Sequence, residues 1–180
     1  MAHAQGSCEQ IAKLLRYPDE TYPRDLLEIP ERLEGHSPET ARLLRSFRDQ
    51  VGGLRLEEIQ ELFTRTFDLS PVCALEVGWQ LYGDEYARGS FLVFMRDALR
   101  RHGIPEAGEL PDHLTHVLPL LDHVPAIEAS EFAGGVVIPA LEKMLKAFAK
   151  KDSPYEDVLR AVQALLQESL ALKPAEVSHA

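Results

Sequence analysis

The sequence predicts an all-α fold, a single-domain bundle of about eight helices. Apolar residues recur at helical spacing along most of the chain, and proline and glycine mark short connections between these segments. No strand precedes a glycine-rich loop, which argues against the nucleotide-binding α/β folds. The 180 residues are enough for one domain with its own core. We expect that domain to span residues 1–172 and residues 173–180 to form a disordered tail.

Two helices are expected first. Ser7 to Gln10 matches a capping box, and Tyr17-Pro18 ends the helix that follows, because the residue before a proline avoids helical backbone angles. A second helix runs from about Pro23 to Gly35. Pro30 lies inside it and has no backbone N–H to donate, so this helix is expected to be short or broken.

The middle of the chain continues in the same pattern. Ser37-Pro38-Glu39 combines a cap, a first-turn proline and a first-turn acid, and the helix it starts ends at Gly52-Gly53. A fourth helix runs from about Leu56 to Phe67. The stretch from Val72 to Gly83 is apolar and interrupted by glycines, so we expect a loop or a short helix there. Asp84 then caps a long helix that reaches Arg101.

The stretch from Glu109 to His113 predicts another helix start. Pro111 suits a first helical turn, and Asp112 would then place its negative charge at the positive end of the helix dipole. This helix ends before Pro125. A seventh segment over residues 128–151 contains Pro139, which implies a kink or a later start. An eighth helix begins at Ser153-Pro154.

Composition excludes several classes of function. The net charge of -10 disfavours binding to nucleic acid through its phosphates. No apolar run reaches 18 residues and the N-terminus lacks the pattern of a secretory signal, so no direct membrane insertion is expected. Cys8 and Cys73 are the only cysteines, and they do not fit a zinc site or a disulfide framework. This usage fits a reducing compartment, and we expect a cytoplasmic location.

The residue types allow two kinds of catalytic site. Asp112, His113 and His116 share one stretch, with His102 and His123 as distant additions, but a zinc site needs three or four converging ligands. Cys73 with His113 is the one candidate combination of a nucleophile and a general base. Cysteine in an apolar segment is more often a packed residue than a nucleophile. We therefore predict no resident metal, no cofactor and no catalytic residue.

A peptide-binding groove is a third interpretation. The stretch from Leu69 to Tyr82 is apolar and aromatic, so it must lie against the core or against a ligand. An amphipathic partner helix suits such a surface. Acidic residues beside the groove would pair with arginines of the partner. The plainer interpretation is that Trp79 and its neighbours fill the core. The acidic residues are Glu76, Asp84, Glu85 and Asp112.

Three blocks of residues carry a resemblance to a known family. They are Leu15-Arg16-Tyr17-Pro18-Asp19-Glu20, the stretch from Leu62 to Pro71 with its continuation to Gly89, and Glu109-Leu110-Pro111-Asp112-His113-Leu114. Together, over residues 8–150, they resemble the nitrate reductase delta subunit (NarJ) branch of the TorD/DmsD/NarJ maturation chaperones.

The resemblance implies an all-helical, TorD/NarJ-like fold without enzyme activity. It implies a cytoplasmic chaperone that binds the N-terminal segment, a twin-arginine signal or its remnant, of a molybdopterin oxidoreductase catalytic subunit. Respiratory nitrate reductase is the favoured client, and related enzymes that act on selenate, chlorate, dimethyl sulfide or hydrocarbons stay open as alternatives. The chaperone holds its client for insertion of the molybdenum cofactor and an iron–sulfur cluster, in concert with cofactor-insertion proteins, and is absent from the finished enzyme.

The resemblance also places the peptide-binding residues. The loop after the fourth helix contributes Pro71 and Glu76, and the later block contributes Glu109, Pro111, Asp112 and His113. The TorD and DmsD branches have an aromatic residue after the loop proline, where this chain has Val72, so Trp79 and Tyr82 are expected to supply the aromatic contacts. A metal-dependent enzyme using Asp112, His113 and His116 and a scaffold for another helical partner stay open as alternatives, as does the choice between monomer and homodimer.

Overall fold

The computed structural model describes residues 6–149 and 151–171 and confirms the all-α class. In this part of the chain the only sheet-like pairing is an isolated bridge between Glu76 and His113. The predicted tail at residues 173–180 lies outside the described residues. The helices are α1 (Ser7–Ala12), extended by a 3-10 turn η1 (Lys13–Leu15), α2 (Tyr22–Leu33), α3 (Pro38–Val51), α4 (Leu56–Thr66), a 3-10 turn η2 (Pro71–Cys73), α5 (Val77–Tyr82), α6 (Tyr86–Arg101), α7 (Leu114–His123), α8 (Ala126–Phe132), a π-helical turn η3 (Ala133–Val137), α9 (Ile138–Phe148) and α10 (Tyr155–Ala171).

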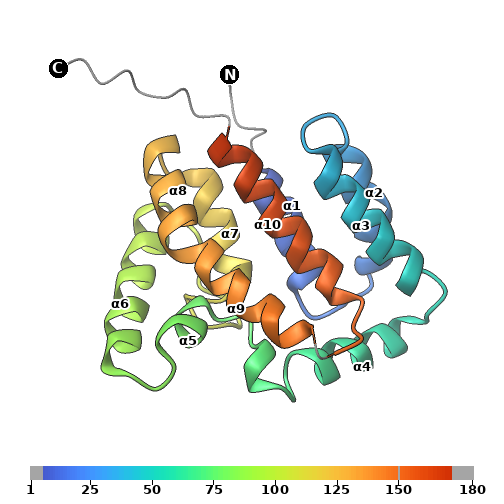
Figure 1. Ribbon diagram of the computed structural model, residues 1–180, viewed down its shortest axis with the longest axis horizontal. Helices are drawn as coiled ribbons and strands as arrows, with labels where there is room; N and C mark the ends of the chain where they lie inside the picture. Colours follow the sequence, from blue (N-terminus) through green and yellow to red (C-terminus); the bar gives the residue numbers. More distant parts are fainter. Residues whose placement is uncertain (1–5, 150, 172–180) are drawn as a thin grey trace.

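The helices pack around a diagonal formed by α10. Figure 1 shows α10 crossing the front of the molecule, with α2 and α3 on one side and α6 at the opposite edge. α10 packs on α3, which packs on α2, while α1 lies against α7. Helix α4 and the short helix α5 run along the lower side in this view. None of the described helices combines the length and apolarity needed to cross a membrane.

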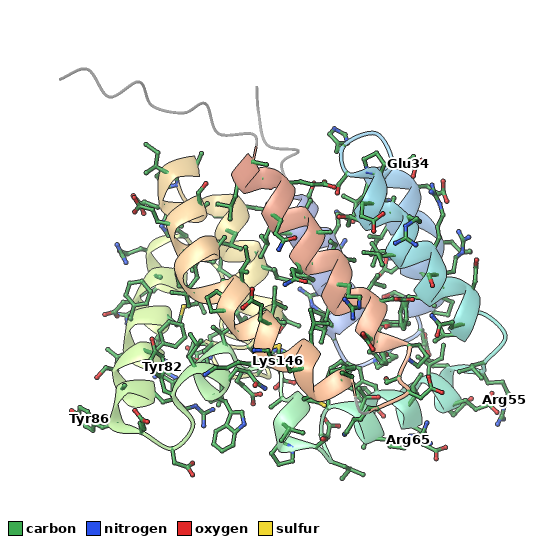
Figure 2. All side chains as sticks on the ribbon, in the orientation of Figure 1. Glu34, Arg55, Arg65, Tyr82, Tyr86 and Lys146 are labelled. Carbon is green, nitrogen blue, oxygen red and sulfur yellow. The ribbon has the colours of Figure 1, made fainter. Side chains whose placement is uncertain are left out.

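The core follows from the apolar stripes of these helices. Helix α7 is buried on all sides from Leu114 to Leu121. An aromatic cluster joins α3, α4 and α10, where the fully buried Tyr155 ring contacts Phe47, Phe63 and Phe67. Figure 2 shows charged side chains such as Glu34, Arg55 and Arg65 at the outer edge. The molecule therefore buries apolar stripes and leaves charge outside, as amphipathic helices require.

The prediction for the second helix was wrong. Helix α2 continues through Pro30 to Leu33 as an unbroken element of 12 residues. Pro30 lies in the last turn and is buried with Leu26, Ile29 and Leu33. The missing N–H removes only one helical hydrogen bond, and burial of this stripe outweighs that loss.

Two predicted helix starts were also wrong. Helix α1 has Gly6 as its N-cap rather than Ser7, and the carboxylate of Asp122 accepts from the Glu9 N–H at 2.8 Å. Helix α7 begins at Leu114 with His113 as N-cap, so Pro111 and Asp112 precede it and do not lie in its first turn. The start of α1 is satisfied by the distant Asp122, whereas the start of α7 is satisfied locally by the side chain of His113, which accepts from the Thr115 N–H.

The other elements lie close to their predicted positions. The stretch from Val72 to Gly83 holds η2 and α5, as expected of a loop or short helix. The N-cap of α6 is Glu85 rather than Asp84. The predicted seventh helix is divided into α8, η3 and α9, and Pro139 lies in the first turn of α9, where its missing N–H is harmless.

Candidate functional site

The loop after α4 and the Glu109 to His113 block meet in space. Glu76 and His113 form an antiparallel bridge. The Val77 N–H donates to the Asp112 carbonyl at 2.9 Å, and the Leu114 N–H donates to the Leu75 carbonyl at 3.0 Å. These backbone bonds fix the start of α5 against the start of α7. Two blocks that are more than 30 residues apart in sequence therefore form one structural unit.

Asp112 is the interior member of this unit. Its side chain is fully buried, and one carboxylate oxygen accepts from the Gly78 N–H at 3.0 Å. The other oxygen, Oδ1, is buried without a hydrogen-bond partner among the described residues. Burial raises the pKa of Asp112, while the charge of Arg88 and the N–H donors of α5 oppose that rise. From this position Asp112 fixes the start of α5. Its carboxylate lies beneath the surface that was predicted to be acidic.

His113 serves as the N-cap of α7. Its Nδ1 accepts from the Thr115 N–H at 3.3 Å and lies 2.7 Å from the Thr115 hydroxyl. Burial, with a smaller effect of the His116 charge, lowers the pKa of His113 to about 3. The ring is therefore neutral at physiological pH and acts as a hydrogen-bonding cap.

Helix α5 presents Trp79 at the side of the unit. The Trp79 Nε1–H donates to the Pro71 carbonyl at 2.9 Å, and Gln80 donates to the Ala74 carbonyl at 2.8 Å. These bonds tie η2 to α5. The guanidinium of Arg88 lies over the Trp79 ring, 5.1 Å from its centroid. Half-buried Glu76 begins the helix, and burial raises its pKa, with Asp112 adding to the rise and Arg88 opposing it.

An exposed apolar edge adjoins Trp79. Leu69 and Val72 are 74% and 59% exposed, and Pro71 between them is also exposed. Tyr82 is half-buried and packs on Phe91 with ring centroids 5.7 Å apart. Adjacent exposed apolar side chains, unlike isolated ones, are a candidate surface for a partner.

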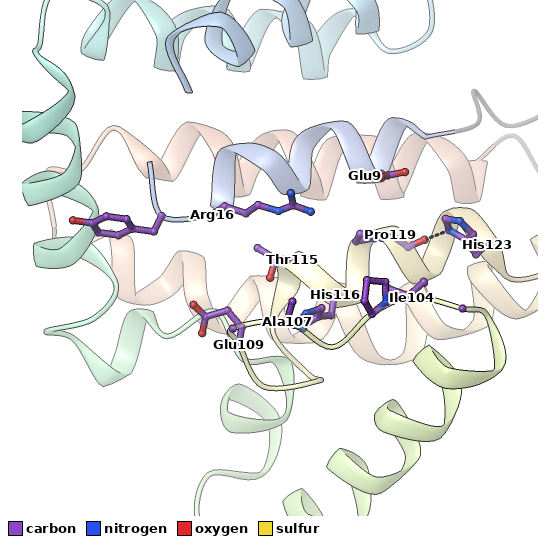
Figure 3. Close-up of a pocket in the computed structure, with 13 residues that line it drawn as sticks. Glu9, Arg16, Ile104, Ala107, Glu109, Thr115, His116, Pro119 and His123 are labelled. Carbon is purple, nitrogen blue, oxygen red and sulfur yellow. Dashed lines mark hydrogen bonds between the residues drawn. The ribbon is translucent and has the colours of Figure 1, made fainter. Parts of the chain in front are cut away.

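A separate cavity lies on the other side of the Glu109 block. It has a volume of about 590 Å³ and lies between η1, α7 and the connection from α6 to α7 (Figure 3). Arg16 and Glu9 give it charges of both signs. Of the predicted peptide-binding residues, Glu109 alone lines it. Its lining is Glu9, Arg16, Tyr17, Gly103, Ile104, Pro105, Ala107, Gly108, Glu109, Thr115, His116, Pro119 and His123.

The structure thus sorts the predicted residues into three groups. Pro71, Glu76, Trp79 and Tyr82 lie on η2 and α5, and all are at least partly accessible. Pro111, Asp112 and His113 are buried behind them. Glu109 is exposed and turned to the separate cavity.

Sequence reasoning missed two residues of the site. Gly78 provides the N–H that binds Asp112, and Arg88 covers Trp79. Both stand inside the quoted blocks, but neither pattern nor spacing indicated their partners. The Gly78 contact pairs α5 with the residues before α7, and the Arg88 contact pairs α5 with the start of α6, so both depend on tertiary pairing.

The donor set does not fit a metal or a nucleophile. Among the described residues, no group of three or more His, Cys, Asp or Glu side chains is arranged to hold a metal ion. His116 uses both ring nitrogens within the protein, with Nδ1 donating to the Leu110 carbonyl at 3.0 Å and Nε2 accepting from the Ala107 N–H at 3.3 Å. Cys73 is fully buried, as a packed residue would be.

The all-helical fold is shared with a protein of known structure. It is similar to the crystal structure of a proposed redox enzyme maturation protein from Archaeoglobus fulgidus, with a TM-score of 0.63 and 21% identity over 93% of this chain and 96% of that one. At this identity the likeness shows the fold alone. No curated protein matches the chain.

The sequence identifies the family. The model of the nitrate reductase delta subunit family matches residues 33–171, more than half of the chain, so the chain belongs to that family. This confirms the resemblance drawn from the three blocks. The family is that of the nitrate reductase delta subunit, and membership in it supports a maturation chaperone role rather than a catalytic one.

Proposed function

We propose that this maturation chaperone acts in the cytoplasm on a molybdopterin oxidoreductase catalytic subunit, with respiratory nitrate reductase as the favoured client. It binds the N-terminal segment of that subunit, a twin-arginine signal or its remnant. It holds the subunit while the molybdenum cofactor and an iron–sulfur cluster are inserted, and it leaves the finished enzyme. Family membership supports the class of client.

One observation carries the choice of binding surface. The bridge between Glu76 and His113 brings two family blocks together, beside the exposed apolar side chains Leu69 and Val72. An amphipathic client helix would cover this edge with its apolar face, and those contacts would supply most of the affinity. Charged residues near the edge would speed association and set the register.

Holding then follows from mass action. A client segment bound to the chaperone is removed from competing binding to the export machinery or to other subunits in proportion to the affinity. The chaperone needs no catalytic group for this task. It needs only an affinity for the segment that is lost when the mature subunit folds around its cofactors.

Isothermal titration tests the proposal. The full chain is titrated with a synthetic peptide that covers the N-terminal segment of the molybdoenzyme catalytic subunit encoded beside it. We expect binding that weakens at least about tenfold in the double variant Leu69→Asp with Val72→Asp, because charge replaces the apolar contact. The melting temperature should stay close to that of the parent, since both side chains are exposed.

Leu27→Asp is the matched control, because Leu27 is 60% exposed on α2, away from the loop. Its affinity should equal that of the parent. Absence of binding to the folded parent would contradict the proposed client. Equal binding by the parent and the double variant would place the contact elsewhere, with the cavity beside Glu109 as the next surface to probe.

A further inference from the structure

Arg88 is poorly satisfied where it lies. Its Nε is buried without a hydrogen-bond partner, and the guanidinium makes no ion pair within 4.0 Å of a described acidic group. It also lies in the first turn of α6, where the helix dipole disfavours a positive charge. A buried N–H without a partner costs free energy. The contacts of Arg88 are therefore weak for a residue that is half-buried.

The surroundings of Arg88 are nevertheless those of a guanidinium site. The Trp79 face provides the best aromatic surface for a cation, and Arg88 lies over it at 5.1 Å. Glu76 adds a half-buried carboxylate from the start of α5, and the fully buried carboxylate of Asp112 adds negative potential from beneath. The charge of Arg88 acts on both carboxyls, lowering the pKa of each against the effect of burial.

The weak contacts of Arg88 and the aromatic and acidic groups around it together describe a guanidinium site that Arg88 fills poorly. An arginine that arrives from another chain is not tied to the first turn of α6. It is free to approach Glu76 bidentately while stacking on Trp79, which the position of Arg88 does not achieve. One buried Asp112 oxygen has no hydrogen-bond partner among the described residues, so the negative potential of the site is only partly compensated.

We infer that the Trp79 face beside Glu76 and Asp112 is an arginine-binding site of the chaperone, occupied in the free protein by Arg88, and that an arginine of the client segment displaces Arg88. This rests on the proposed function for the identity of the client. It assigns to Arg88 the role of an internal competitor, which lowers the apparent affinity by the fraction of time that it occupies the site.

Peptide titration tests the competition. Two peptides are compared, the client N-terminal segment and the same peptide with each arginine replaced by citrulline, which keeps the shape and removes the charge. Arg88→Ala should bind the arginine peptide about threefold to tenfold more tightly than the parent does. The affinity for the citrulline peptide should not change. Arg88→Gln keeps most of the aliphatic stem and should also tighten binding.

Arg101→Ala is the matched control, since Arg101 is an exposed arginine at the other end of α6. It should bind both peptides as the parent does. If Arg88→Ala weakens binding of both peptides, Arg88 is itself a client contact and the inference is overturned. Unchanged affinity for the arginine peptide overturns it as well, while the proposed function stands.

A second measurement does not depend on the client. Trp79 is the only tryptophan in the chain, so its fluorescence reports on this site alone. In Arg88→Ala, N-acetyl-arginine amide at millimolar concentration should change the emission saturably, and N-acetyl-citrulline amide should not. The parent should respond more weakly to the arginine compound. Identical responses to the two compounds exclude a guanidinium site, whereas failure of peptide binding in all proteins counts against the proposed client only.

Discussion

At the scale of single residues, Asp112 and His113 act inside the protein. Asp112 is fully buried and accepts a hydrogen bond from the Gly78 N–H, and His113 caps α7. Both were predicted from the resemblance to border the client. In this structure they position α5 and α7, and the residues that face outward are on η2 and α5. If an Asp112 variant loses client binding, we therefore expect the cause to be displacement of η2 and α5 and not the loss of a direct contact with the client.

Replacement of Asp112 tests this assignment. Asp112→Ala leaves the Gly78 N–H without its acceptor, so the free energy of unfolding in urea should fall by about 1–3 kcal/mol. Asp112→Asn keeps an oxygen for that N–H and removes a buried charge, so it should lose less. An Asp112→Ala protein with the stability of the parent but a loss of peptide affinity would instead identify a surface contact.

His113 predicts a specific dependence of stability on pH. Its folded pKa of about 3 lies below the ordinary value of 6.5, so the unfolded chain binds the additional proton between these values. The contribution of His113 is therefore fully present above pH 6.5 and declines by up to about 1.4 kcal/mol per pH unit as the pH falls toward 3. His113→Asn retains a capping side chain and should remove this slope.

The measurement for His113 is urea unfolding of parent and variant at pH 7.5 and 5.5. The difference in slope between the two proteins isolates His113 from the other titrating groups of the chain. An equal slope in the parent and in His113→Asn would show that His113 is not held neutral.

At the scale of elements, the flanks of α7 organise two short helices. Asp112 precedes α7 and binds the start of α5, and Asp122 in the last turn of α7 binds the start of α1. Helices of six residues are marginal by themselves because nucleation is costly. A carboxylate at the N-terminus satisfies an N–H and complements the dipole. The buried helix α7 therefore fixes both elements from its two ends.

Gly78 shows how tightly α5 is held. A Cβ at this position would lie 2.7 Å from the Asp112 carboxylate and 2.8 Å from the Phe91 ring. Gly78→Ala should therefore destabilise the protein by about 1–3 kcal/mol, although alanine is the better helix former. Thermal unfolding followed by circular dichroism measures the change.

Gly89 in α6 is the matched control for Gly78. A Cβ there would meet no atom within 4 Å, so Gly89→Ala should stabilise the protein by about 0.4–1 kcal/mol. Opposite signs for the two substitutions are the expected result. If Gly78→Ala is also stabilising, α5 has room to move away from Asp112.

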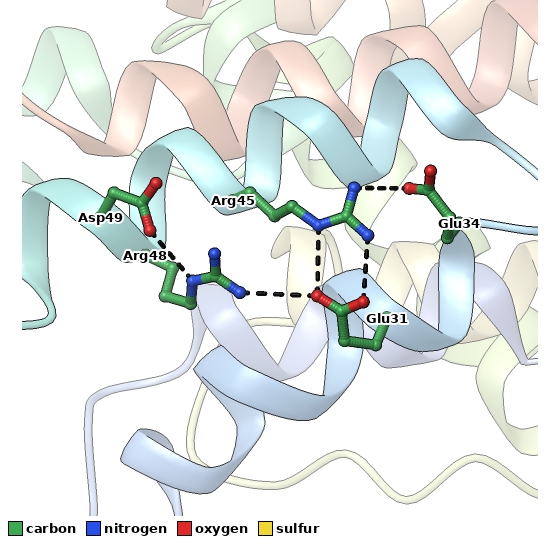
Figure 4. A network of polar contacts seen from close by, with 5 residues as sticks. All are labelled: Glu31, Glu34, Arg45, Arg48 and Asp49. Carbon is green, nitrogen blue, oxygen red and sulfur yellow. Dashed lines mark hydrogen bonds and ion pairs between the residues drawn. The ribbon is translucent and has the colours of Figure 1, made fainter.

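At the scale of the whole molecule, aromatic packing joins the two ends of the chain. The Tyr155 ring on α10 contacts α3 and α4, and its hydroxyl lies 3.1 Å from that of Tyr22 on α2. Tyr22 in turn donates to the Leu14 carbonyl at 2.9 Å. The ion pairs between α2 and α3 are on the surface, where solvent screens them, and contribute little (Figure 4).

Tyr155 variants separate the ring from the hydroxyl. Tyr155→Phe should cost about 0.5–1.5 kcal/mol, since Tyr22 retains the Leu14 carbonyl as acceptor. Tyr155→Ala should cost about 3–5 kcal/mol because it opens a cavity among four helices. Tyr86→Phe is the control, and its effect should stay within about 0.5 kcal/mol because Tyr86 is 92% exposed. Urea unfolding midpoints measure all three.

The sequence by itself determined the helical class, the positions of most helices and the family. Apolar spacing, caps and turn residues act over a few positions and can be read locally, as at Ser37-Pro38, and the family blocks are contiguous. Only the tertiary structure decided that α2 continues through Pro30, that Asp112 binds α5 instead of starting α7, and that Arg88 covers Trp79. These outcomes depend on burial and on contacts between distant segments, whose energies outweigh local preference.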